Sequence, residues 1–332
     1  MKNFFLNRKK PYVIAEIGTN HNGKIADAYK LIKSAKECGC DAVKFQSWDT
    51  SMHSNLFWKN NKKGYENDKK LSVDKKFLGK AKSYCKKIKI DFSSTPFSFK
   101  QLEELVTLKP KFIKIASMDL DNLELLDLAA KQKFPVIVST GNSSIKEIIK
   151  ASEVFKKRRK KDVLFMHCVS LYPPKVEELN LRNILTIQKS IQFPIGYSDH
   201  SEGVLAPILA ASIGVNFIEK HFTLNKKQNG PDHFFAAEPE CMKKLVEEVN
   251  NVGKALGSYE RGINKRELIS KKRMRRSAYS TRNLNKGEPL KRDDFIMQRP
   301  GIGLNLEQIK NLIGKKIKKN IIKDAVIHSS NF

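Results

Sequence analysis

The feature that most constrains the fold of this 332-residue chain is a short apolar segment that recurs eight times, in alternation with helical patterns. Such alternation is typical of β-α units, whose strands pair in parallel. The predicted strands cover residues 12–17, 42–45, 90–93, 112–116, 135–138, 163–166, 194–196 and 215–218, and helical patterns cover, for example, residues 24–38, 73–86, 123–131, 145–155, 203–213 and 239–256. Eight units in about 250 residues predict the α/β fold class and a (β/α)8 TIM barrel. The alternative is an open doubly wound sheet, but no glycine-rich phosphate fingerprint follows the first strand.

Two parts of the chain interrupt this alternation. Residues 51–72 form a long, polar stretch with several aromatic side chains, and we expect a loop there that could act as a lid. After residue 256 the sequence becomes basic and rich in turn residues, with short β-like runs. We therefore predict a barrel domain at 1–258, a linker at 259–276 and a small β-rich domain at 277–332, too small to have much core of its own.

The composition is that of a soluble cytoplasmic enzyme. Hydrophobic residues make up 40% of the chain, and no apolar run approaches the length of a membrane span. The apolar stretch at the N-terminus is too short for a signal peptide. The five cysteines are odd in number and have no zinc-finger spacing, so we expect reduced thiols.

The net charge of +28 raises the question of a nucleic-acid partner. Lysines far outnumber arginines and are spread along the chain, with one local cluster at 271–276. A nucleic-acid surface more often concentrates arginine with exposed aromatic residues. A general compositional bias is the better explanation, so we predict no nucleic-acid partner. The positive field would also attract a polyanionic small substrate.

Polar residues stand at or just beyond the end of every predicted strand. Because TIM barrels carry their active sites at the carboxyl ends of the strands, these residues should surround one site. A purely structural barrel would not need them, since burying an unpaired charge costs several kcal/mol. In strand order they are Glu16; Lys44 and Gln46; Ser94 and Thr95; Lys114 and Ser117; Ser139 and Thr140; His167, Ser170 and Tyr172; Ser198, Asp199 and His200; Lys220 and His221.

The pair His200 and His221 ends the last two predicted strands. Neutral imidazoles at neighbouring strand ends suit a catalytic divalent metal with open positions for water and substrate. For either histidine alone, a hydrogen-bonded core residue would be the better interpretation. The other polar strand ends favour the metal site.

Lys44 and Lys114 each lie between apolar neighbours and alternate into the barrel interior. They could be ion-paired to Glu16 or Asp119, or one of them could form a Schiff base as in an aldolase. We favour binding of a phosphate and a carboxylate, because two ammonium groups with hydroxyl donors match a multiply charged substrate.

Several short motifs resemble those of the sialic acid synthase family, the synthases of nonulosonic acids. The resemblance runs in order along nearly the whole chain. In the barrel it is carried by Ala15-Glu-Ile-Gly-Thr-Asn-His-Asn-Gly23, Asp41-Ala-Val-Lys-Phe-Gln46, Ser94-Thr-Pro-Phe97, Phe112-Ile-Lys-Ile-Ala-Ser117, Ser139-Thr-Gly141, Tyr197-Ser-Asp-His200, Glu219-Lys-His-Phe-Thr223 and Gly230-Pro-Asp-His233. Arg275-Arg-Ser277, Lys286-Gly-Glu288 and Arg299-Pro-Gly301 resemble the antifreeze-like (SAF, β-clip) domain that ends these synthases.

The resemblance implies condensation of phosphoenolpyruvate with an N-acetylated hexosamine, giving a nine-carbon 2-keto sugar acid and phosphate. It also implies a divalent metal, Mn²⁺ or Mg²⁺, and a homodimer that swaps its C-terminal domains. Phosphoenolpyruvate would be bound by Lys44, Thr95, Lys114, Ser117, Ser139, Ser170 and Ser198, the sugar by Gln46, Tyr172, Asp232 and Arg299, and the metal by His200 and His221. Catalytic roles would fall to Glu16, Lys44, Lys114, Asp119 and Asp232.

Two positions depart from the family pattern. Ser170 stands where members often have Asn, and Asp119 where they often have Glu. Either change could reflect a different sugar, so N-acetylmannosamine (for sialic acid) and 2,4-diacetamido-6-deoxyhexoses (for legionaminic or pseudaminic acid) stay open as substrates. A basic protein that binds nucleic acid or ice is a further alternative, although it leaves the polar strand ends unexplained.

Overall fold

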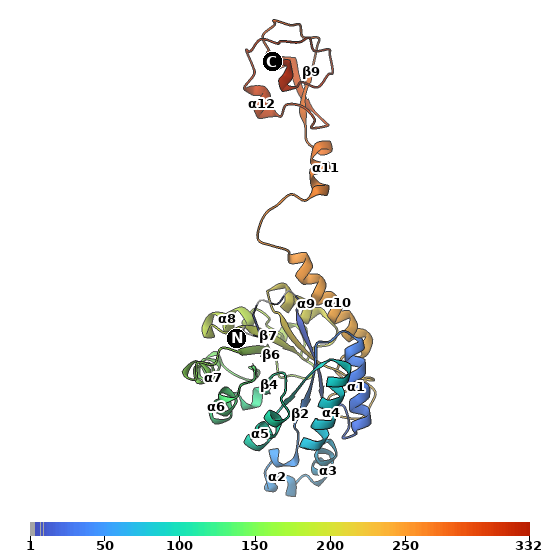
Figure 1. The fold of residues 1–332 in the computed structure, drawn as a ribbon, viewed down its shortest axis with the longest axis vertical. Coiled ribbons are helices and arrows are strands. Elements are labelled where there is room, and N and C mark those ends of the chain that lie inside the picture. Colours follow the sequence, from blue (N-terminus) through green and yellow to red (C-terminus); the bar gives the residue numbers. More distant parts are fainter. Residues whose placement is uncertain (1–3, 7, 9) are drawn as a thin grey trace. The chain divides into compact units, whose positions relative to one another are not determined.

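Eight parallel strands curl into a nearly closed barrel in the computed structural model, which describes residues 4–6, 8 and 10–332 (Figure 1). The strands are β1 (Tyr12–Gly18), β2 (Ala42–Gln46), β3 (Asp91–Thr95), β4 (Ile113–Ile115), β5 (Val136–Ser139), β6 (Val163–Cys168), β7 (Ile195–Asp199) and β8 (Phe217–His221). Their order is β3-β2-β1-β8-β7-β6-β5-β4, and β3 also contacts β4. Because β1 pairs with β8, the first strand meets the last, which confirms the TIM barrel and excludes the doubly wound sheet.

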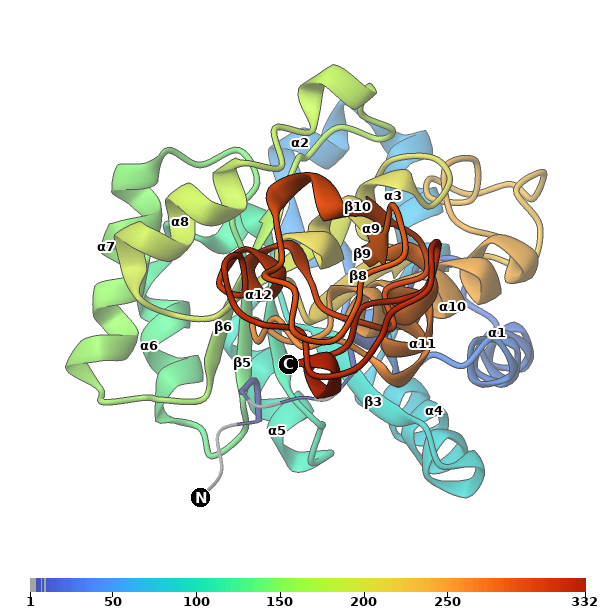
Figure 2. The same cartoon turned by 90° about the horizontal axis from the view of Figure 1, so that it is seen from above.

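Helices follow the strands and cover the outside of the barrel (Figure 2). They are α1 (Ile25–Glu37), α4 (Lys75–Ile88), α5 (Phe99–Thr107), α6 (Leu123–Lys131), α7 (Ile145–Lys157), α8 (Asn183–Ile191), α9 (Leu205–Ser212) and α10 (Pro239–Leu256). Helix α7 illustrates why these segments are helical. Ser144 and Glu147 form a capping box at its start, and Ile148, Ala151 and Phe155 recur at helical spacing and are buried.

The alternation of side chains along the strands divides the barrel into layers. In β1, Val13, Ala15 and Ile17 point outward and pack in the main core between strands and helices. Residues of the opposite parity point inward, and the lower ones form an apolar plug that includes Ile14 and Phe217. The next inward position on each of these two strands is a carboxylate, Glu16 on β1 and Glu219 on β8. The strand period of two therefore leads from an apolar floor to a polar upper layer.

The stretch 51–72, predicted as a loop, contains two helices, α2 (Asn55–Lys59) and α3 (Lys62–Leu71). The predicted loop is therefore largely helical. Ser54 and Asn61 accept hydrogen bonds from backbone N–H groups at the two helix starts. The buried Trp58 contacts the rings of neighbouring aromatic residues and fixes the segment locally.

The chain divides into two compact units, Met1–Gly257 and Ser258–Phe332. The second contains α11 (Lys265–Met274), an antiparallel pair of β9 (Ser277–Ser280) and β10 (Phe295–Gln298), and α12 (Leu306–Lys310). Its small apolar core comes mostly from residues between 278 and 327. Helix α11 lies within residues 259–276, the stretch predicted as a linker.

Candidate active site

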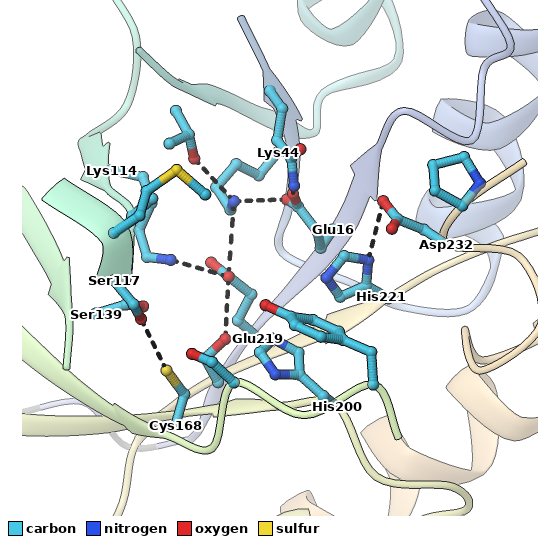
Figure 3. Close-up of a pocket in the computed structure, with 18 of the residues that line it drawn as sticks. Glu16, Lys44, Lys114, Ser117, Ser139, Cys168, His200, Glu219, His221 and Asp232 are labelled. Carbon is cyan, nitrogen blue, oxygen red and sulfur yellow. Dashed lines mark hydrogen bonds and ion pairs between the residues drawn. The ribbon is translucent and has the colours of Figure 1, made fainter. Parts of the chain in front are cut away.

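A cavity of about 460 Å³ opens at the carboxyl ends of the barrel strands (Figure 3). This volume lies within the range of small-molecule sites, roughly 300–1,000 Å³. Most of the residues predicted for the site line it, namely Glu16, Lys44, Gln46, Thr95, Lys114, Ser117, Ser139, Ser170, Tyr172, Ser198, His200, His221 and Asp232. Two predicted residues, Asp119 and Arg299, are not among the lining residues.

Two lysines and two glutamates form a buried charge cluster on the cavity wall. The Lys44 ammonium lies 2.7 Å from a Glu16 carboxylate oxygen and 3.6 Å from Glu219, and Lys114 lies 3.0 Å from Glu219. None of the four residues is more than 4% exposed. Lys44 also donates to Thr95 Oγ1 at 3.0 Å, and Ser198 Oγ donates to Glu219 at 3.2 Å.

Glu219 is the main functional candidate that the sequence analysis did not assign. It stands within the motif Glu219-Lys-His-Phe-Thr223, whereas the sequence suggests Glu16 or Asp119 as ion-pair partners of Lys114. The signal was present, because Glu219 lies two residues before His221 and strand alternation places both on one face. The predicted strand ended at the apolar Ile218 and so left it out.

Burial and the opposite charges set the protonation states of the cluster. Burial raises the pKa of Glu16 to about 7, although Lys44 acts to lower it. Burial acts to raise the pKa of Glu219 as well, but Lys114 and Lys44 outweigh it, and the net pKa is lowered. Burial lowers the pKa of Lys114 despite Glu219, whereas the two carboxylates outweigh burial and raise the pKa of Lys44. The cluster thus holds an ionised Glu219 between two ammonium groups.

The imidazoles of His200 and His221 lie side by side, with ring centroids 5.4 Å apart. Burial lowers the pKa of His200 to about 4 and that of His221 well below its usual value, so both rings are neutral near pH 7. His200 Nδ1 lies 2.8 Å from the Val169 carbonyl, which fixes the tautomer with Nε2 as a free acceptor. His221 Nδ1 is buried without a hydrogen-bond partner, 3.7 Å from an Asp232 oxygen.

These donors suit a divalent metal of the catalytic kind. Two neutral nitrogen ligands with a nearby carboxylate leave positions for water and substrate oxygens. Within residues 4–6, 8 and 10–332, no group of three or more His, Cys, Asp or Glu side chains is arranged to hold a metal.

A group of small side chains also lines the cavity. Ser117 Oγ accepts from the Gly141 N–H at 2.9 Å and lies 3.1 Å from Cys168 Sγ. A Cβ atom at Gly141 would lie only 2.1 Å from Ser170 Oγ, so a side chain there would displace this wall. Ser139 Oγ is buried without a partner. These hydroxyl groups are available to donate to a ligand.

Aromatic side chains lie around the polar groups, and they include Trp48, Phe97, Tyr172, Phe234 and Phe235. The Tyr172 ring lies 4.2 Å from the His200 ring, and Phe235 lies 4.9 Å from His221. Aromatic surface beside convergent polar groups is typical of a pocket for an organic substrate.

Asp119 and Arg299 are not among the residues that line this cavity. Asp119 ends a short 3₁₀ turn after β4, and burial raises its pKa to about 6. Arg299 belongs to the second unit, where its Nε donates to the Met274 carbonyl at 2.8 Å. Asp199 and Lys220, also noted at strand ends, point away from the cavity and pair with each other.

The five cysteines form no disulfide. In the described part of the chain, no helix has the length and apolarity to cross a membrane.

The chain is similar to known proteins along nearly its whole length. The NeuB family matches residues 31–261, and the SAF domain matches residues 275–332. The chain is 35% identical over 324 residues to N,N'-diacetyllegionaminic acid synthase of Legionella pneumophila, covering 93% of this chain and 91% of that protein. It is 32% identical over 340 residues to pseudaminic acid synthase of Campylobacter jejuni, covering 99% and 98%. The crystal structure of N-acetylneuraminic acid (sialic acid) synthetase from Leptospira borgpetersenii in complex with citrate superposes with a TM-score of 0.73 at 35% identity, covering 79% of this chain and 90% of that one.

Proposed function

Because the chain belongs to the NeuB family, we propose that it condenses phosphoenolpyruvate with the open-chain form of an N-acylated hexosamine. The products are a nine-carbon 2-keto sugar acid of the sialic type and phosphate. The observation that carries this proposal is the buried cluster of Lys44, Lys114, Glu16 and Glu219 in one cavity with the two neutral imidazoles.

The lysines are suited to hold the two anionic groups of phosphoenolpyruvate. Lys44 and Lys114 are buried, and charge-assisted contacts in such surroundings are the strong ones. Ser117, Ser139 and Ser198, with Thr95 and Ser170, add hydroxyl donors around them. Glu219 is the carboxylate paired with Lys114, and a bound anion would compete with it for this ammonium group.

In the proposed reaction, C3 of phosphoenolpyruvate forms a bond to the aldehyde carbon of the sugar. Positive charge develops at C2 and is captured by water, and the resulting tetrahedral carbon expels phosphate as its C–O bond breaks. Lys44 and Lys114 offset negative charge on the carboxylate and on the leaving phosphate. Glu16, whose pKa burial raises to about 7, is suited to accept a proton from the attacking water.

A divalent cation, Mn²⁺ or Mg²⁺, is part of the proposal, with His200 and His221 as its protein ligands. When bound, it would polarise the sugar aldehyde. Gln46, Tyr172 and Asp232 are proposed to contact the sugar. Burial raises the pKa of Asp232, which favours a hydrogen-bonding role beside the sugar hydroxyls.

We also propose the class of the sugar substrate and the assembly of the chain. The named relatives make legionaminic, pseudaminic and N-acetylneuraminic acids, so N-acetylmannosamine and 2,4-diacetamido-6-deoxyhexoses are the candidate substrates. We further propose a homodimer in which the C-terminal domain of one chain brings Arg299 to the site of the other. An arginine could bind sugar hydroxyls or an acyl carbonyl through its planar fork.

The test is a phosphate-release assay with phosphoenolpyruvate, Mn²⁺ and a panel of these N-acylated sugars. We expect release that depends on one sugar class and yields a 2-keto acid of matching mass. The rival function is a Schiff-base aldolase, which the lowered pKa of Lys114 favours. Borohydride with pyruvate would trap an adduct on Lys114 in that case, whereas the synthase leaves the protein mass unchanged.

A further inference from the structure

A buried ion pair lies directly behind the two candidate metal ligands. Asp199 precedes His200 at the end of β7, and Lys220 precedes His221 at the end of β8, and the two residues are partners in the register of these strands. Lys220 Nζ lies 2.5 Å from Asp199 Oδ2. Both side chains are buried and face away from the cavity, because they have the opposite strand parity to the histidines.

The same two residues bind Ser201, which directly follows His200. Asp199 Oδ1 accepts hydrogen bonds from the Ser201 N–H at 3.0 Å and from Ser201 Oγ at 2.7 Å. Lys220 Nζ donates to the Ser201 carbonyl at 2.6 Å. Tyr197 Oη completes the set by donating to Asp199 Oδ1 at 3.0 Å. His200 is therefore the central residue of a closed turn that is tied to the residue before His221.

This arrangement is costly if its only purpose is stability. Two buried charges contribute little beyond a hydrophobic pair of the same volume, since their desolvation offsets their attraction. Such a pair can instead fix the register of strands β7 and β8. Here the register decides whether the rings of His200 and His221 face each other, as they do at 5.4 Å.

We propose that the Asp199–Lys220 ion pair positions His200 and His221 for metal binding. Neither side chain lines the cavity, so both members are proposed as positioning residues. The inference deepens the proposed function and rests on its divalent-metal site. Outer contacts of metal-binding histidines typically change metal affinity about 10- to 100-fold when removed.

The test is Mn²⁺ titration of the purified full chain, with free Mn²⁺ measured by electron paramagnetic resonance. Asp199→Asn and Lys220→Met each remove one charge with little change of shape. We expect both to weaken Mn²⁺ binding about 10- to 100-fold while circular dichroism stays unchanged. Saturating Mn²⁺ should restore most of kcat, since the defect lies in ligand geometry. As a matched control, Asp127→Asn breaks an exposed pair with Arg158 and should leave Mn²⁺ affinity unchanged.

A milder variant covers the case in which the charge variants do not fold. Ser201→Ala removes only the hydroxyl contact to Asp199, and we expect affinity to fall roughly 2- to 10-fold, the equivalent of one hydrogen bond. Folded variants that bind Mn²⁺ as tightly as wild type would overturn this inference alone, and so would a folded Ser201→Ala of normal affinity. A wild-type chain that binds no Mn²⁺ would instead overturn the metal site itself.

Discussion

Glu219 should stabilise the substrate-free protein and compete with the substrate anion, and Glu219→Gln separates these two effects. The substitution keeps the shape but removes the carboxylate that lies 3.0 Å from Lys114 and 3.6 Å from Lys44. Lys44 keeps Glu16 at 2.7 Å, so mainly Lys114 loses its partner. Removing one member of a buried ion pair lowers the free energy of unfolding by about 3–5 kcal/mol. Because Lys44 keeps a partner in Glu16, we expect Glu219→Gln to lower it by about 3 kcal/mol.

For a domain of this size that loss lowers Tm by roughly 6–12 °C. The loss should depend on pH in a defined direction. Burial lowers the pKa of Lys114 and Glu219 acts to raise it, so the variant has a still lower Lys114 pKa. A depressed lysine pKa disfavours the protonated form in the folded state, so the deficit is largest near neutral pH and shrinks as pH rises towards the unfolded pKa of about 10.4.

The assay is urea and thermal unfolding with and without phosphoenolpyruvate. Because the ligand anion would replace the missing carboxylate, phosphoenolpyruvate should stabilise the variant more than wild type. Glu153→Gln, at an exposed pair with Lys156, is the control and should change stability by less than about 0.5 kcal/mol. A Glu219→Gln protein as stable as wild type would refute the energetic role of the cluster. Equal stabilisation by phosphoenolpyruvate would refute the competition.

Four further predictions follow from the same geometry. Lys114→Met should reduce kcat/KM for phosphoenolpyruvate about 10- to 150-fold, the equivalent of roughly 1.5–3 kcal/mol for a charge-assisted contact, and unchanged kinetics would place the anion elsewhere. His221→Ala should abolish Mn²⁺ binding and activity with the fold intact, which calorimetry and circular dichroism would check. Burial lowers the pKa of His21 to about 4, whereas the unfolded chain protonates His21 below a pKa of about 6.5. The free energy of unfolding should therefore decrease as pH falls from about 6.5 towards 4, and His21→Leu should remove about 3 kcal/mol of this decrease. Mixed Arg299→Ala and His221→Ala subunits should regain part of the activity if the C-terminal domains swap, and no recovery despite proven subunit exchange would contradict the swap.

Much of the barrel could be predicted because its signal is local. The apolar strands and amphipathic helices recur at regular spacing, and the helices at 123–131 and 239–256 were predicted with the observed bounds. The predicted strands β7 and β8 stopped too early, at 196 and 218, because an apolar criterion ends where the polar layer begins. That layer lines the candidate site, so the same error hid Glu219.

Other features depend on contacts that a strand or helix period does not encode. Asp119 follows β4 by only a few residues, but a 3₁₀ turn redirects the chain there and Asp119 does not line the cavity. Helix α2 is too short to show a clear period and helix α3 has too few apolar residues, and both depend on caps and on Trp58. The pairing of Asp199 with Lys220 follows from the register of two strands, which the sequence of either strand does not specify.

The most direct test of the proposed chemistry follows the bridging oxygen of phosphoenolpyruvate. The purified protein is incubated with Mn²⁺, the active sugar and phosphoenolpyruvate that carries ¹⁸O between C2 and phosphorus, and both products are weighed by mass spectrometry. Capture of C2 by water followed by C–O cleavage predicts that the label leaves with phosphate and that the 2-keto acid is unlabelled. Label retained in the keto group of the product, or no phosphate release with any sugar of the panel, would contradict the proposed reaction.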